Sequence, residues 1–153
     1  MPAADVVEML RVRFAAEPFV LGVQLGAEHL LEAARALRDA HGYRYYISGT
    51  AVDRAETIEV LHGVRNVQTN DELWVKVVLP REQPVIESLA FVYAGAEWHE
   101  REVLDLFGVS FKSHPDPRRL LMPDEYEGHP LRKDFPMDTP WGYRPATAVE
   151  PGE

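Results

Sequence analysis

Proline is distributed very unevenly along this chain, and this feature constrains the fold more than any other. Residues 1–112 contain four prolines, whereas residues 113–153 contain eight. Proline has no backbone N–H and interrupts the interiors of helices and sheets, so the last 41 residues cannot form long regular elements. We therefore divide the chain into a domain of residues 1–112 and an extended C-terminal arm of residues 113–153, which we expect to bind a partner.

The proline-rich arm also carries large apolar side chains. They include Leu121, Tyr126, Phe135, Trp141 and Tyr143. Disordered segments are usually poor in such residues, because large apolar groups gain free energy by burial. The arm therefore needs a groove, either on its own domain or on another chain.

The first 112 residues show a mixed α and β pattern. Apolar residues recur at helical spacing in some segments and alternate in others. We expect helices over residues 5–14, 28–40, 84–89 and 95–107, and strands over residues 19–25, 43–52, 57–67 and 73–79. The predicted fold class is α+β, a compact domain with a mixed or antiparallel sheet of about four strands packed by helices.

Composition argues against several functional classes. The chain has no cysteine, so thiolate zinc sites, Fe–S ligation and a cysteine nucleophile are excluded. Its net charge of −9 disfavours nucleic acid and anionic membrane surfaces as partners. No apolar run approaches the roughly 20 residues that span a bilayer. Glycine-rich phosphate loops and the Gly-x-Ser-x-Gly motif are also missing. We expect a soluble, intracellular binding module rather than a self-contained enzyme.

The segment from Glu97 to Phe111 carries the most information. On a helix, Val103, Leu106 and Phe107 would share an apolar face. Glu100 falls within that apolar sector, and a buried carboxylate is costly without a partner. Arginine is the natural partner, with Arg118, Arg119, Arg132 or another chain as candidates. Arg101, Glu102, Asp105 and Trp98 lie on the opposite face, a composition that suits a protein contact.

A metal site is a competing interpretation. His99 and Glu102 are three positions apart on the predicted helix, and His114 follows in a proline-rich loop. The His-Glu-x-x-His pattern fails because position 103 is valine. We favour a structural role for these histidines over a stand-alone metal-dependent hydrolase.

The same segment resembles a known family signature. The matching residues run Glu100-Arg101-Glu102-x-x-Asp105-Leu106-Phe107-Gly108-Val109-x-Phe111-x-x-His114-Pro115-Asp116-x-Arg118-Arg119-Leu120-Leu121, and the match continues from Met122 to Pro136. This stretch resembles the 30 kDa subunit of respiratory complex I, whose bacterial counterpart is the C subunit of NADH-quinone oxidoreductase. Its charged, aromatic, glycine and proline positions are all in register.

The resemblance implies a fold, a role and partners. The family fold is a compact α+β domain followed by an extended C-terminal segment. The protein belongs to the hydrophilic arm of the complex, on the cytoplasmic face of the membrane. It binds no FMN, Fe–S cluster, quinone or metal, since the cofactors sit on partner subunits. The resemblance implies that it packs against the large hydrogenase-like D subunit, near the Fe–S subunits B and I. Related subunits occur in membrane-bound [NiFe]-hydrogenase and F420H2 dehydrogenase complexes, so the electron donor stays open.

The resemblance also implies candidate partner-contact residues. They are Glu100, Arg101, Glu102, Asp105, Phe107, Gly108, His114, Arg118, Arg119, Leu121, His129, Pro130, Arg132, Lys133, Asp134 and Phe135. Four aromatic residues, Trp98, Tyr126, Trp141 and Tyr143, are candidate interface anchors. A solvated charged helix face is the plainer alternative, but we expect a buried or interfacial ion network. Gly108 is expected to end the helix with a positive φ. For Tyr126, packing on the chain's own domain is an equally open alternative.

Overall fold

Two α-helices and a short strand pair begin the chain. The computed structural model describes residues 4–135. Helix α1 (Ala4–Phe14) buries Val6, Leu10 and Phe14, which recur about one turn apart. Strands β1 (Glu17–Phe19) and β2 (Gly22–Leu25) follow, then the 3-10 turn η1 (Ala27–His29) and helix α2 (Leu30–Asp39). Helix α2 buries Leu30, Ala33, Ala34 and Leu37 against the sheet.

Three long strands form the centre of the molecule. They are β3 (Tyr45–Asp53), β4 (Thr57–Asn66) and β5 (Asp71–Pro80). Both β3–β4 and β4–β5 are antiparallel, whereas β2 pairs parallel to β5, which gives a mixed five-stranded sheet in the order β1-β2-β5-β4-β3. Alternate residues such as Ile58, Val60 and Val64 are buried, as the period of two in a strand requires.

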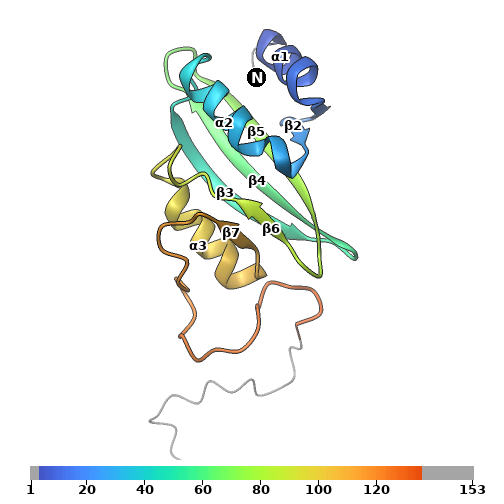
Figure 1. Ribbon diagram of the computed structural model, residues 1–153, viewed down its shortest axis with the longest axis vertical. Helices are drawn as coiled ribbons and strands as arrows, with labels where there is room; N and C mark the ends of the chain where they lie inside the picture. Colours follow the sequence, from blue (N-terminus) through green and yellow to red (C-terminus); the bar gives the residue numbers. More distant parts are fainter. Residues whose placement is uncertain (1–3, 136–153) are drawn as a thin grey trace, which may run out of the picture.

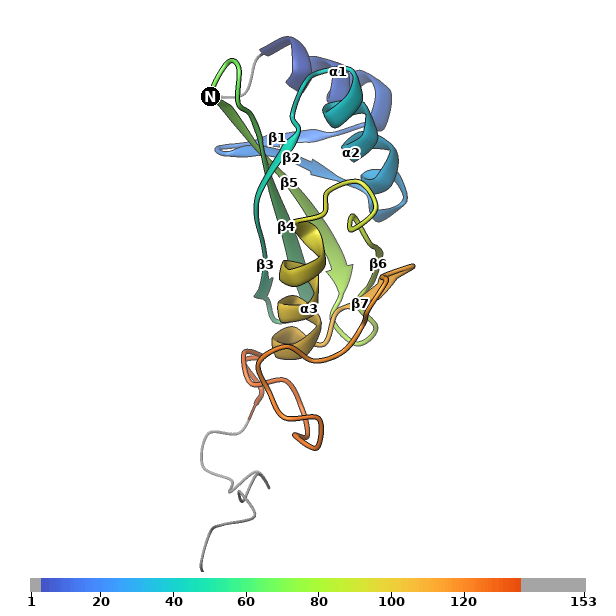
Figure 2. The ribbon, with the colours of Figure 1, turned by 90° about the vertical axis from the view of Figure 1, so that its left-hand side faces the viewer.

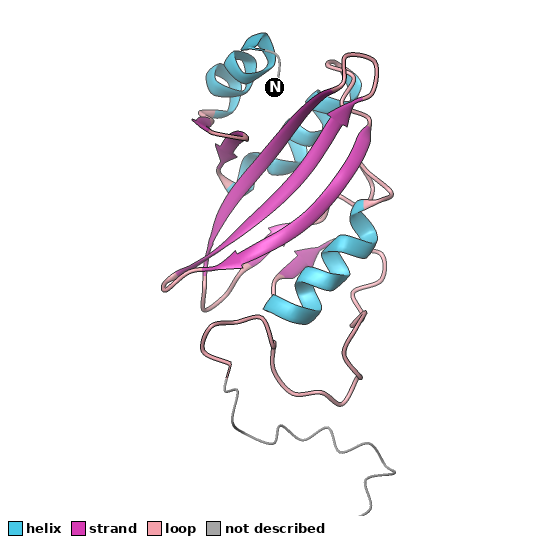
Figure 3. Cartoon of the chain, turned by 180° about the vertical axis from the view of Figure 1, so that it is seen from behind, coloured by secondary structure: helices cyan, strands magenta, loops and turns pink. Residues whose placement is uncertain are grey.

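The third helix and a second small sheet complete the domain. Strand β6 (Val85–Glu87) pairs parallel to β7 (Ser110–Lys112), and helix α3 (Ala96–Phe107) connects them. Helices α1, α2 and α3 lie on the same side of the large sheet (Figures 1 and 2). Figure 3 shows the opposite sheet face, which no helix covers within residues 4–135.

The α+β class and the mixed sheet are confirmed, with three differences in detail. The sheet has five strands rather than about four, because the run from Phe19 to Leu25 is interrupted by a turn at Val20 and Leu21 that separates β1 from β2. The helix expected over residues 84–89 is wrong. Those residues form β6, since Val85–Glu87 finds hydrogen-bonding partners in β7, 25 positions later. Asp53, one position beyond the strand expected over residues 43–52, is the buried last residue of β3.

Residues 113–135, called the strap below, contain no helix or strand. The strap runs beside α3 and continues past its C-terminal end (Figure 1). Residues 136–153 of the expected arm, including Trp141 and Tyr143, lie outside the described residues. No helix between residues 4 and 135 is long and apolar enough to cross a membrane.

Candidate functional site

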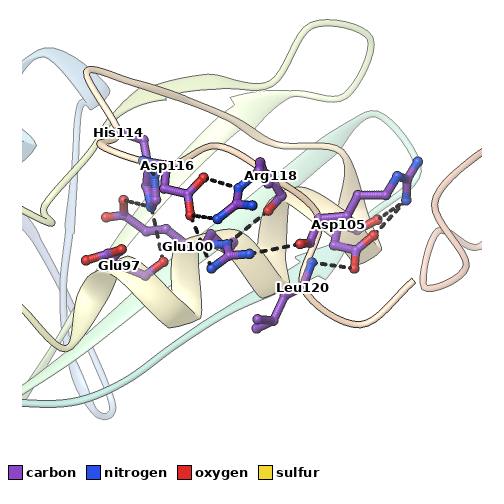
Figure 4. Close-up of polar contacts among 9 residues, drawn as sticks. Glu97, Glu100, Asp105, His114, Asp116, Arg118 and Leu120 are labelled. Carbon is purple, nitrogen blue, oxygen red and sulfur yellow. Dashed lines mark hydrogen bonds and ion pairs between the residues drawn. The ribbon is translucent and has the colours of Figure 1, made fainter. Parts of the chain in front are cut away.

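Helix α3 buries three charged side chains. Glu100, Arg101 and Asp105 are 1%, 8% and 0% exposed, respectively. Charged groups are almost never buried without partners, because their desolvation costs several kcal/mol. The contacts of these three residues therefore define the candidate site, which Figure 4 shows in close-up.

A stripe of α3 residues spaced four apart binds the first part of the strap. His114 donates from Nε2 to the carbonyl oxygen of Glu97 at 3.1 Å. Arg101 donates from Nε and Nη2 to the carbonyl oxygens of Arg118 and Arg119, each at 3.0 Å. Residues four apart on a helix lie on one face, so Glu97, Arg101 and Asp105 face the strap together. The strap therefore follows α3 in the same chain direction.

Asp105 is enclosed by donors from the strap. One carboxylate oxygen accepts the backbone N–H groups of Leu120, Leu121 and Met122 at 3.1, 2.7 and 2.8 Å. The other accepts from Arg119 at 2.6 Å. Burial alone would raise the pKa of Asp105, but these four donors outweigh burial and hold its pKa below the ordinary value. Asp105 is thus an ionised group around which the strap backbone folds.

Gly108 and the second part of the strap satisfy the C-terminal carbonyls of α3. These carbonyls have no partner within a helix. The Gly108 N–H donates to the carbonyl oxygen of Leu104, and Nδ1 of His129 donates to that of Asp105 at 2.8 Å. The Leu131 N–H donates to the carbonyl oxygen of Leu106 at 3.1 Å. Nε of Arg132 donates to that of Phe107 at 2.6 Å. All four last carbonyls of α3 are therefore bonded. Arg132 and Arg119 also bring positive charge to the negative end of the helix dipole.

Gly108 makes this close approach possible. Its φ is +72°, as predicted for a residue that ends a helix. A Cβ at this position would also lie 2.5 Å from Cδ2 of His129. Glycine is therefore required both by the backbone conformation and by the space that the strap occupies.

The end of the strap is fixed to the large sheet. Asp53 accepts the backbone N–H of Lys133 at 2.8 Å and two bonds from Arg81 at 2.7 and 3.0 Å. Arg81 also pairs with Asp134 of the strap at 2.7 Å. The Arg81 guanidinium and the Lys133 N–H hold the pKa of Asp53 below its ordinary value. Neither Asp53 nor Arg81 was among the residues predicted from the sequence. Asp53 could have been recognised as a candidate, because it is a charged residue at the end of an apolar strand.

Glu100 is buried beside polar groups rather than an arginine. Ser88 Oγ donates to it at 2.5 Å, the N–H of Leu89 at 2.6 Å, and Nε2 of His114 lies 3.7 Å away. Burial raises the pKa of Glu100 to about 7, and the two donors only partly oppose this. None of the three candidate arginines of this chain therefore pairs with Glu100. Arg119 pairs with Asp105, Arg118 pairs with Asp116 at 2.6 Å, and Arg132 donates to Phe107.

A second buried polar pair lies under α3. The Tyr46 hydroxyl and Nδ1 of His62 are 2.7 Å apart, and both side chains are buried. Nε2 of His62 has no hydrogen-bond partner among the described residues. Burial, with a smaller effect from His99, lowers the pKa of His62 to about 4. This pair was not predicted from the sequence. His62 falls in the alternation of Val60 and Val64, so it could have been assigned to the core face of the strand.

The arrangement does not assemble the alternative metal site. No group of three or more His, Asp or Glu residues within the described part of the chain could hold a metal ion. The His99 ring packs on Tyr46 at 5.7 Å, and His114 binds Glu97 and Asp116. The histidines therefore act within the domain.

The remaining candidate residues are distributed over the strap and α3. Glu102, Phe107, His129, Pro130, Arg132 and Phe135 are half-buried, whereas Trp98, Arg118, Leu121, Lys133 and Asp134 are exposed. Trp98 stacks under the Arg101 guanidinium, 5.1 Å from it. Tyr126 stacks on Phe135 at 6.2 Å, so it packs on its own chain. The strap of the same chain covers the Arg101–Asp105 face. The expected ion network is buried within the chain.

Comparisons of this chain with known proteins all point to the same family. The family model described as "Respiratory-chain NADH dehydrogenase, 30 Kd subunit" matches residues 23–140. The C subunit of NADH-quinone oxidoreductase from Moorella thermoacetica is 41% identical over 118 residues, covering 76% of this chain and 80% of that protein. The same subunit from Mycobacteroides abscessus is 36% identical over 140 residues, covering 87% of this chain. This chain spans 61% of the length of that relative.

Solved structures show the same fold. A structure named "Nqo5 of the trypsin-resistant fragment (1-134)" has a TM-score of 0.62 at 26% identity, covering 73% of this chain and 96% of that one. A chain of the membrane-bound sulfane sulfur reductase, an archaeal respiratory membrane complex, has a TM-score of 0.76 at 26% identity. It covers 87% of this chain and 84% of that one.

Proposed function

Because the chain belongs to the 30 kDa subunit family of respiratory-chain NADH dehydrogenase, we propose that it is a non-catalytic structural subunit of a complex I-type NADH-quinone oxidoreductase. In this role it supports electron transfer from NADH through Fe–S clusters to quinone, coupled to proton translocation, by fixing the neighbouring redox subunits. The observation that carries the proposal is the 41% identity to the Moorella thermoacetica protein over 80% of that protein's length.

The site geometry supports a structural role. The ionised groups of α3 and the strap are directed at each other and at backbone groups, as Asp105 and Arg101 illustrate. Such contacts fix the path of a segment. We propose that FMN, the Fe–S clusters and quinone are held by partner subunits and that this chain holds none of them.

The proposed partners are the large hydrogenase-like D subunit and the Fe–S subunits B and I. We propose that the domain of residues 1–112 and the arm of residues 113–153 act together, with the arm contacting the large hydrogenase-like partner. The complex would hold the chain peripherally at the cytoplasmic face of the membrane. The candidate interface residue Trp98, 58% exposed, is available for such a contact.

A tagged copy of the chain in its native cells tests this role. The tag should recover the D, B and I subunits together, and deletion of the gene should remove NADH:quinone activity from membranes. The purified chain alone should contain no flavin or iron. Turnover by the isolated chain, or recovery without any of these subunits, would contradict the proposal.

A second candidate is the equivalent subunit of a related membrane complex. The match to a chain of an archaeal sulfane sulfur reductase complex, with a TM-score of 0.76, supports this second candidate. A related membrane-bound [NiFe]-hydrogenase or F420H2 dehydrogenase belongs to the same group. The electron donor that the recovered complex oxidises separates these possibilities.

A further inference from the structure

Two exposed leucines of the strap are anchored near the C-terminal end of α3. Leu121 is 61% exposed and Leu131 is 52% exposed. The backbone N–H of Leu121 bonds to the side chain of Asp105, and that of Leu131 bonds to the carbonyl of the next residue, Leu106. Although ten positions separate the two leucines, both are therefore attached to adjacent residues of one helix.

The backbone that carries these leucines is held by contacts within the chain itself. Arg119 binds Asp105 with one nitrogen and the Gly128 carbonyl with another at 3.1 Å, so it joins the two limbs of the strap. The stacked rings of Tyr126 and Phe135 link the middle of the loop between the leucines to the chain beyond Leu131. Because ordering a loop on binding costs free energy, a loop that is already fixed loses less on association.

The loop between the leucines is acidic on its outer surface. Asp124, Glu125 and Glu127 are all exposed. Complementary charge at the rim of an interface steers association and selects partners. On the side of residues 124–127 the leucines therefore have an acidic border, which fits an apolar pocket that carries lysine or arginine on the facing side.

We propose that Leu121 and Leu131, presented together by the strap, form a docking surface for an apolar, basic-rimmed pocket of a neighbouring protein subunit. The proposal rests on the structural role proposed above and deepens it by naming the surface and the chemistry of its partner. Asp105 acts as the positioning residue of this surface, because it fixes the N–H of Leu121 while its own carbonyl accepts from His129.

The test is recovery of the parent complex through a tag on the full-length chain. The variant Leu121→Asp with Leu131→Asp should lower the recovered partner subunits by about tenfold or more, because it places charge in an apolar contact. The control is Val20→Asp in the β1–β2 turn, where the side chain is 95% exposed. It should recover the complex as the unmodified chain does. Circular dichroism should show that both variants are folded, as expected for exposed positions.

A charge variant tests the acidic rim separately. Glu125→Lys with Glu127→Lys should lower recovery more at low salt than at high salt, since exposed charges are screened. The control Glu17→Lys, an exposed position in β1, should have no such effect.

Three outcomes would contradict the proposal in different ways. If the unmodified chain recovers the complex and the double leucine variant does so equally, the docking surface is wrong. If the unmodified chain recovers none of the partner subunits, the proposed function fails first. If the purified chain is a dimer in light scattering and the leucine variant is a monomer, the surface binds a second copy and the assignment to another subunit is wrong.

Discussion

Asp105 is the residue on which the strap depends most directly. An asparagine there would lose the ion pair with Arg119 and turn an amide N–H₂ toward backbone donors. We expect Asp105→Asn to lower the free energy of unfolding by about 3 kcal/mol, the range for breaking a buried charge pair. Urea denaturation measures this. The control is Glu102→Gln, a half-buried carboxylate on the same helix, which should change the value by less than about 0.5 kcal/mol. Equal effects of the two variants would contradict the role of Asp105.

Glu100 and His62 make opposite contributions to the pH dependence of stability. The pKa of Glu100 rises from 4.5 to about 7 on folding. The Glu100 carboxyl therefore holds its proton more strongly in the folded state than in the unfolded state. Its contribution to stability is present below pH 4.5 and is lost as pH rises toward 7. The pKa of His62 falls from 6.5 to about 4, so its contribution is present above pH 6.5 and is lost as pH falls toward 4.

The two effects overlap and should largely cancel in the unmodified protein. Relative to it, Glu100→Gln should add stability as pH rises from 4.5 to 7, because the cost of ionising a buried carboxyl is removed. His62→Gln should remove the loss of stability as pH falls from 6.5 to 4. Urea denaturation at a series of pH values checks both slopes. The same slope in both variants would show that these groups do not titrate as the structure indicates.

At the scale of the element, the junction of α3 and the strap depends on one glycine. Gly108→Ala would force a side chain into a left-handed backbone conformation and against His129. We expect a loss of about 1 to 3 kcal/mol in the free energy of unfolding. The matched control is Gly95→Ala at the other end of α3, where φ is −65° and the nearest atom would be 3.5 Å away. Thermal denaturation of the two variants gives the comparison, and a tolerated Gly108→Ala would contradict the argument.

The elements differ in how far the sequence could predict them. Helix α2 and strands β3 to β5 carry their own periodicity, so their existence followed from local pattern. The segment at Val85–Glu87 could not be assigned, because its strand conformation depends on β7, which is remote in sequence. The charged face of α3 was correctly located, but its partner was not. Arg101 and Asp105 bind backbone groups of residues 118–122, and a sequence shows side-chain types rather than backbone positions.

At the scale of the whole molecule, the chain can be shortened at two informative places. Truncation after Phe135 keeps every strap contact described above and serves as the reference chain. Truncation after Lys112 removes the partners of Arg101 and Asp105. We expect a lower midpoint in urea and loss of association with the proposed partner, while most secondary structure remains by circular dichroism. Normal association after truncation at Lys112 would show that the arm is not needed.

The bond from Lys133 to Asp53 joins residues 80 positions apart. Closing so long a loop is entropically unfavourable until both ends are already in place. The strap can therefore fold into place only when β3 and α3 have formed. Pulsed hydrogen exchange should find that the amides of Leu121 and Leu131 become protected after those of the central strands. An incompletely folded chain would then lack the surface formed by Leu121 and Leu131. It would not bind the partner subunit, so only folded copies would enter the complex.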